Sequence, residues 1–246
     1  MAKTLNAQAV AQFQRDGYYL HNEPVFSESR FQELSAIFEE HLAGKGEKLG
    51  DQLDTPHFRD ERLLGFLMDE HVLDLVEQLI GPNIGLWSSH FISKEAKVGR
   101  ATPWHSDAGY WKGRFEQFTG LVTIWLAIDP TDEENGCMRV IPGTHRTEEG
   151  EYVPVDSAAN TFQLELQNVD ETDAVYFELK PNECSFHDSR LIHGAKANTS
   201  DRRRTGYTMR YFSQDMKLVT DHPGNQGFKI WHCRGGNPHG NPVVNG

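Results

Sequence analysis

Apolar residues recur at helical spacing in the first third of the chain, most clearly between Ser27 and Gly44. They fall on one face of a helix, and they are Phe31, Leu34, Ile37, Phe38 and Leu42. Ser27 is a favourable N-cap because its hydroxyl can accept a hydrogen bond from a free N–H of the first turn, and Gly44 is a typical stop. The pattern predicts an amphipathic helix between these two residues.

Two shorter helices are predicted on the same grounds, at residues 7–16 and 70–80. A glycine follows each of them, at Gly17 and Gly81, and glycine readily adopts the left-handed conformation that ends a helix. The segment 44–62 is polar and contains glycine, so it is predicted to be a loop.

After Gly81 the pattern changes to short segments rich in β-branched and aromatic residues, separated by Pro, Asn and Gly turn signals. The clearest predicted strands cover residues 84–94, 121–129, 137–141, 174–179, 184–187 and 204–212. Many short strands without alternating helices are typical of an antiparallel jelly roll rather than a doubly wound parallel sheet. The expected fold is an all-β core, a double-stranded β-helix of the cupin-like jelly-roll type, with N-terminal helices packed on it.

The length of 246 residues suits one domain. We expect a mainly helical part at 1–82, the jelly-roll core at 83–212 and an irregular C-terminal cover at 213–246. No internal repeat divides the chain.

Charge and composition narrow the possible partners. The formal net charge of −12 opposes binding to nucleic acid and offers no basic anchor for an anionic membrane. No apolar run approaches the roughly 20 residues that span a bilayer, and the N-terminus lacks the apolar block of a secretory signal. The three cysteines are widely separated, so neither a disulfide framework nor a CxxC motif is expected. We therefore predict a cytoplasmic protein that acts on a small molecule; the substrate and the oligomeric state stay open.

The candidate chemistry starts with a His-x-Asp pair. His105 and Asp107 are two positions apart, which in an extended strand places both side chains on one face. A third ligand, His193, would complete a facial triad of two imidazoles and one carboxylate, leaving positions open for a chelating cosubstrate and O2. Taken alone, the pair is weak evidence for a metal site, because an ordinary strand end can carry the same residues.

The segment that follows His193 strengthens the metal interpretation. Eleven positions later, Arg204 opens a predicted strand whose even-numbered face also carries Thr208 and Arg210. Two arginines on one face indicate a polar lumen, and an arginine there could bind the distal carboxylate of 2-oxoglutarate through paired hydrogen bonds. We interpret Arg202 and Arg203 as a solvated basic stretch.

Several fragments resemble the phytanoyl-CoA dioxygenase family, and they occur in the same order. They are FQRDGYYL, PWHSDAGYW, IWLAIDPTDEENGCMRVIPGTHR, FHDSRLIHGAKANTSDRRR and MRYF. The resemblance spans most of the chain, and the combination is far more specific than any one fragment.

This resemblance implies iron(II) held by His105, Asp107 and His193, with 2-oxoglutarate as cosubstrate and O2 as oxidant. The family's cosubstrate arginine corresponds to Arg204, and its tryptophan beside 2-oxoglutarate corresponds to Trp125.

Two positions depart from the family pattern. A further position of the cosubstrate wall corresponds to His90, where relatives often have an apolar residue. Ala195 replaces a serine that many relatives have two positions after the distal histidine, so one hydroxyl contact is expected to be missing.

Other histidines and aromatic residues near these motifs have simpler interpretations. His145 is expected to hold a turn, and His187 to support the triad by hydrogen bonding rather than to bind metal. The aromatic residues Tyr110, Trp111 and Phe115 could line the substrate entrance or could be ordinary packing.

The implied reaction is hydroxylation of an unactivated C–H bond of a metabolite, with release of succinate and CO2. Family members that halogenate resemble this chain but have Ala or Gly at the position of Asp107. The carboxylate of Asp107 therefore predicts oxygen insertion, or a related oxidative outcome such as desaturation, and no halogenation. Two alternatives remain: a zinc-dependent hydrolase on the same ligands, and a non-catalytic jelly roll that binds a metal or small molecule. The hydrolase leaves Arg204 and Trp125 unexplained.

Overall fold

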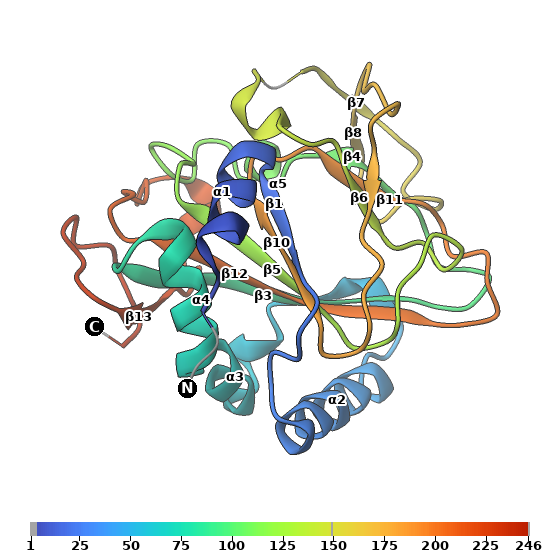
Figure 1. Cartoon of the computed structure of the whole chain (residues 1–246), viewed down its shortest axis with the longest axis horizontal. Coiled ribbons are helices and arrows are strands. Elements are labelled where there is room, and N and C mark those ends of the chain that lie inside the picture. The colour runs from blue at the N-terminus through green and yellow to red at the C-terminus, as the bar shows by residue number, and fades with distance from the viewer. Residues whose placement is uncertain (1–3, 149, 246) are drawn as a thin grey trace.

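Two antiparallel sheets face each other in the computed structural model, which describes residues 4–148 and 150–245 (Figure 1). The larger sheet has seven strands in the order β1-β10-β5-β12-β3-β13, with β2 beside β3. Its strands are β1 (Tyr18–His21), β2 (Leu53–Asp54), β3 (Ile84–Lys94), β5 (Leu121–Ala127), β10 (Cys184–Asp188), β12 (Arg204–Ser213) and β13 (Trp231–Arg234). The architecture confirms the predicted double-stranded β-helix.

The smaller sheet has four strands in the order β4-β11-β6-β9. They are β4 (Thr102–His105), β6 (Met138–Val140), β9 (Val175–Tyr176) and β11 (His193–Ala195). A separate hairpin is formed by β7 (Tyr152–Pro154) and β8 (Leu164–Leu166).

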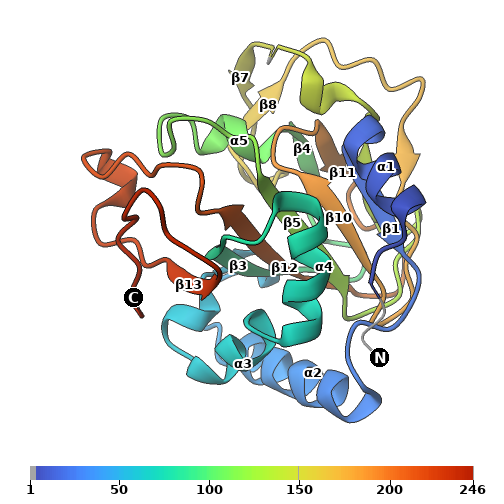
Figure 2. The same ribbon diagram turned by 60° about the vertical axis from the view of Figure 1, so that its left-hand side comes forward.

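The N-terminal helices cover the outer face of the larger sheet (Figure 2). They are α1 (Ala7–Asp16), α2 (Glu28–Ala43), α3 (Leu64–Leu67) and α4 (Glu70–Ile80). The three predicted helices are confirmed with their bounds. Ser27 caps α2 by accepting a hydrogen bond from Arg30 N, and Gly17 ends α1 in the left-handed region with φ 81°.

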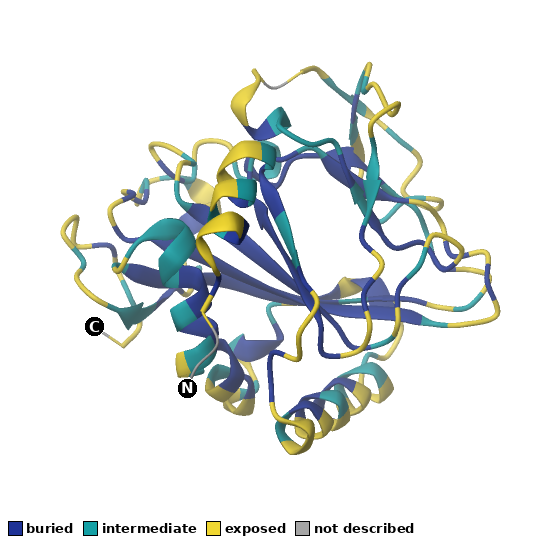
Figure 3. Ribbon diagram, viewed as in Figure 1, coloured by how far each residue is buried: buried dark blue, intermediate teal, exposed yellow. Residues whose placement is uncertain are grey.

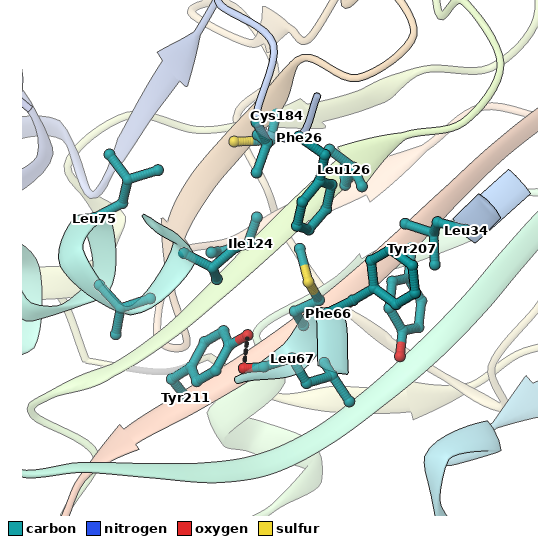
Figure 4. Close-up of a cluster of buried hydrophobic side chains, with 14 of the residues drawn as sticks. Phe26, Leu34, Phe66, Leu67, Leu75, Ile124, Leu126, Cys184, Tyr207 and Tyr211 are labelled. Carbon is teal, nitrogen blue, oxygen red and sulfur yellow. Dashed lines mark hydrogen bonds between the residues drawn. The ribbon is translucent and has the colours of Figure 1, made fainter. Parts of the chain in front are cut away.

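The main hydrophobic core lies between these helices and the sheet, where the strands are buried along most of their length (Figure 3). On β12 the odd-numbered side chains Tyr207, Met209 and Tyr211 belong to this core. Figure 4 shows Tyr211 beside the helical segment α3, where its hydroxyl donates to Leu67 O at 2.8 Å. The even-numbered side chains of β12 therefore face the interior between the two sheets.

The predicted strands are found in the structure, with shifted ends. β3 has the predicted bounds, whereas the predicted strand 174–179 is reduced to β9. The predicted loop 44–62 contains short 3-10 turns and β2. The C-terminal cover is not wholly irregular, because β13 pairs with β3 at the sheet edge.

The three cysteines are unpaired. Asn198 pairs with Gly99 in an isolated β-bridge and is 1% exposed, and its side-chain amide donates to Lys94 O and Arg202 O. Within residues 4–148 and 150–245, no helix is long and apolar enough to cross a membrane.

Candidate active site

The three predicted metal ligands come together at one mouth of the barrel. His105 ends β4 and His193 begins β11, and the two residues are direct partners in the antiparallel ladder. One ligand atom from each of His105, Asp107 and His193 lies within 4.8 Å of the other two, and all three residues are buried. Two imidazoles and one carboxylate in this arrangement suit iron(II).

Asp107 reaches the cluster by a different route from the predicted one. The strand ends at His105, and Asp107 is the first residue of the short helix α5 (Asp107–Tyr110). Ser106 has an extended backbone and caps this helix, its hydroxyl accepting a hydrogen bond from Gly109 N at 2.9 Å. The expectation that both ligands lie on one strand was wrong, but the extended Ser106 still directs them to the same side.

Backbone carbonyl groups fix the orientation of both imidazole rings. His105 Nδ1 donates to Pro103 O at 2.8 Å, and His193 Nδ1 donates to Leu191 O at 2.9 Å. A carbonyl can only accept, so the proton of each neutral ring is on Nδ1 and the lone pair is on Nε2. Burial lowers the pKa of both histidines, which favours this neutral, metal-binding form.

The Asp107 carboxylate is also held by its surroundings. Thr123 on β5 donates to Asp107 Oδ2 at 3.0 Å, and Arg210 Nε lies 3.5 Å from the same oxygen. Burial alone would raise the pKa of Asp107, but the positive charge of Arg210 holds it well below its usual range. The carboxylate is therefore ionised, with Oδ2 occupied and Oδ1 directed to His105 at 4.0 Å from its Nε2.

An inner cavity extends from the ligand cluster toward Arg204 and Trp125. The Arg204 guanidinium stacks over the Trp125 ring at 4.4 Å and is 2% exposed. Burial lowers its pKa to about 10, so it stays charged at neutral pH. Within the described part of the chain, its Nε has no hydrogen-bond partner and no carboxylate pairs with it. A buried, unpaired guanidinium at the end of a cavity fits an anionic ligand such as the distal carboxylate of 2-oxoglutarate.

The structure places His90 elsewhere than predicted. Its Nε2 contacts Asp51 O at 3.0 Å, and it lines a second, outer cavity. The residue of β3 that lines the inner cavity is Ile92. His90, two positions earlier on the same strand, lines only the outer cavity. Ala195 does line the inner cavity, and it offers no hydroxyl there.

His145 has the turn-holding position that was expected, whereas His187 lies beside the triad without the expected hydrogen bond to it. His145 Nε2 lies 3.3 Å from Gln14 O and ties a turn to α1. His187 Nε2 lies 3.8 Å from Asp107 Oδ2, and its ring packs 4.7 Å from that of His193. It is not part of the cluster of ligand atoms.

The outer cavity has a volume of about 580 Å³ and shares Asp107 and Arg210 with the inner one. Tyr110 and Trp111 line it, as one of the two interpretations predicted. Phe115 instead packs in a hydrophobic cluster and is 3% exposed. The outer cavity opens beside the ligand cluster, where a substrate would have to enter.

The sequence interpretation missed the contacts of Thr123 and Arg210 with Asp107. Thr123 is a polar residue two positions before Trp125 on a predicted strand, so the two side chains share a face, and that signal could have indicated it. Arg210 was placed on the correct face, but its proximity to Asp107 depends on how β12 lies across the barrel mouth.

The fold and the ligand cluster define a double-stranded β-helix protein with a two-histidine, one-carboxylate metal site. The family model described as "Phytanoyl-CoA dioxygenase (PhyH)" matches residues 13–206. The chain therefore belongs to the phytanoyl-CoA dioxygenase family. A peroxisomal phytanoyl-CoA dioxygenase of Mus musculus is 28% identical over 166 residues, which cover 65% of this chain and 48% of that protein. The chain thus spans about half of that relative's length.

Solved structures share the same fold. The non-heme monooxygenase ThoJ has a TM-score of 0.77 at 20% identity, covering 96% of this chain and 86% of that one. EvdO2 from Micromonospora carbonacea, solved with 2-oxoglutarate, has a TM-score of 0.70 at 25% identity, covering 91% of this chain and 97% of that one.

Proposed function

We propose that this chain is an iron(II)- and 2-oxoglutarate-dependent oxygenase that hydroxylates an unactivated C–H bond of a small-molecule metabolite. The observation that carries the proposal is a buried cluster of two histidines and one carboxylate, joined by one cavity to an unpaired buried arginine. A zinc hydrolase could use the same three ligands, but its reaction would not require the buried, unpaired guanidinium of Arg204. The 2-oxoglutarate bound in the structure of EvdO2 supports the same assignment.

His105, Asp107 and His193 would hold the metal, while Arg204, stacked on Trp125, would anchor the far carboxylate of 2-oxoglutarate. Bound iron(II) and 2-oxoglutarate supply the chemistry, in which O2 is divided between the substrate C–H bond, which becomes C–OH, and 2-oxoglutarate, which becomes succinate and CO2. The protein determines how the substrate lies relative to the metal and the cosubstrate. Its buried ligands exclude bulk water, and the outer cavity determines which C–H bond is closest.

The ligand carboxylate also separates hydroxylation from halogenation. Asp107 is ionised and held by Thr123, so chloride would have to displace a bound, negatively charged ligand. We expect a product made under ¹⁸O2 with excess chloride to gain one labelled oxygen. A chlorine isotope pattern in that product would overturn the hydroxylase assignment.

The test of the function itself needs no substrate. Anaerobic addition of iron(II) and 2-oxoglutarate should give the weak visible charge-transfer band of the chelate, and the same addition with zinc(II) is the control. Absence of the band with iron(II) bound would contradict the proposal. We also propose a cytosolic location, consistent with three unpaired cysteines, which localisation of a fluorescent fusion would test.

A further inference from the structure

We propose that Arg210 is the binding point for an anionic oxygen group of the substrate, such as a carboxylate, sulfonate or phosphonate. The inference rests on the proposed function and adds the chemical class of the substrate. Arg210 lines both the inner and the outer cavity, so its guanidinium lies at the boundary between the ligand cluster and the substrate space.

The hydrogen-bonding capacity of Arg210 is largely unused although the residue is only 7% exposed. Its Nε lies 3.5 Å from Asp107 Oδ2, and its Nη1 lies 3.5 Å from Ser88 Oγ. Both distances are at the outer limit for a hydrogen bond. In the described residues, Nη2 has no hydrogen bond, and the guanidinium lies 5.3 Å from the Trp111 ring centre. A buried guanidinium with five donors and two long contacts is incomplete without another acceptor.

The charge balance of the loaded site also leaves Arg210 unmatched. Iron(II) would bring two positive charges and Arg204 brings one. They balance the two negative charges of 2-oxoglutarate and the single negative charge of Asp107. Arg210 is then a surplus positive charge in a buried region, where an uncompensated charge is costly. An anionic group on the substrate would neutralise it.

The other charged side chains of the outer cavity are already engaged or lie at its rim. Asp51 is paired with Arg100, whose Nε donates to its carboxylate at 3.0 Å. Arg114 donates to Asn225 Oδ1 and Gly224 O, at 2.8 and 2.6 Å.

Two charged residues remain at the rim of the outer cavity. Lys48 is exposed, and the Asp54 side chain is 65% exposed. Their charges are screened by water, so neither can replace the buried Arg210 as an anchor.

This position has a consequence for the reaction. Because Arg210 contacts a metal ligand, an anion bound to it would lie beside the cluster, and the oxidised carbon would be within a few bonds of the anionic group. Trp111 and Phe162 also line the outer cavity, and they would make apolar contacts with the rest of the substrate.

The experiment uses enzyme loaded with nickel(II), as an inert substitute for iron, and saturated with 2-oxoglutarate. Calorimetry measures its dissociation constants for a panel of small carboxylates and sulfonates, each paired with its neutral amide or sulfonamide. The variants are Arg210→Gln and Lys48→Gln. Each removes one positive charge from the outer cavity, the first at its buried end beside the ligand cluster and the second at its exposed rim.

We expect the anionic members to bind more tightly than their neutral partners. Arg210→Gln should weaken anion binding at least about 30-fold, because it removes one partner of a buried charge pair. Lys48→Gln should change it by less than about 3-fold, because the exposed charge is screened.

Two results would overturn the proposal: no anion is preferred over its neutral partner, or Arg210→Gln keeps the anion affinities while losing nickel. The second result would make Arg210 a positioning residue for Asp107 only. Failure of the charge-transfer band with iron(II) would contradict the oxygenase assignment itself, whereas a normal band without anion preference would contradict only this inference.

Discussion

The two faces of β12 carry opposite chemistry although their residues alternate along one strand. Tyr207, Met209 and Tyr211 pack against the helices in the main core, whereas Arg204 and Arg210 face the cavities. The outer face contributes buried apolar area, whose removal from water is the dominant favourable term in folding. The inner face holds buried charges that would be balanced by bound ligands. Stability and chemistry are therefore separated by the thickness of one sheet, and substitutions on the two faces should have different consequences.

The largest expected effect is on the inner face. His193→Ala should abolish bound iron and succinate formation, because two ligands remain where three are needed. The free energy of unfolding of the metal-free protein should hardly change, because the main core lies on the other face of the larger sheet. Metal analysis and urea denaturation measure the two quantities; an equal iron content in the variant would remove His193 from the proposed triad.

The largest expected effect on stability belongs to the outer face. Phe186 on β10 is fully buried in the main core, so Phe186→Ala should lower the free energy of unfolding by about 3–5 kcal/mol. The matched control is its neighbour Ser185, which points to the other face and whose hydroxyl has no partner in the described residues. Ser185→Ala should cost less than about 1 kcal/mol. Similar losses in both variants would contradict the separation of the faces.

Arg204→Ala should weaken 2-oxoglutarate binding by about 2–5 kcal/mol, or roughly 30-fold to several thousand-fold, while iron stays bound. Arg203→Ala is the control, because Arg203 points away and donates to Asp129 Oδ2 at 2.8 Å. Titration of the charge-transfer band gives both affinities. If Arg203→Ala weakens binding and Arg204→Ala does not, the assignment of the cosubstrate arginine is wrong by one residue.

The smallest expected effects come from removing one hydroxyl on each face. Thr123→Val deletes the hydrogen bond to Asp107 and should reduce iron affinity about 10–100-fold. Tyr211→Phe deletes the hydrogen bond to Leu67 O and should lower the free energy of unfolding by about 0.5–1.5 kcal/mol (Figure 4). Metal titration should detect only Thr123→Val, and denaturation should detect only Tyr211→Phe. A loss of iron affinity in Tyr211→Phe would show that the two faces are coupled.

The sequence by itself determined the three longer helices, the bounds of β3 and the alternation of β12. Helices could be predicted because their hydrogen bonds and caps are local, within four residues along the chain. It also indicated the three candidate ligands, through their spacing and the family resemblance.

Only the tertiary structure decided the short strands and the finer contacts of the site. β1 and β13 exist because distant segments, β10 and β3, provide their partners, and local pattern carries little information about that. Asp107 lies on a helical turn rather than a strand because Ser106 caps that turn. The approach of Arg210 to Asp107 depends on how β12 crosses the barrel mouth, since it joins residues 103 positions apart that no local rule connects.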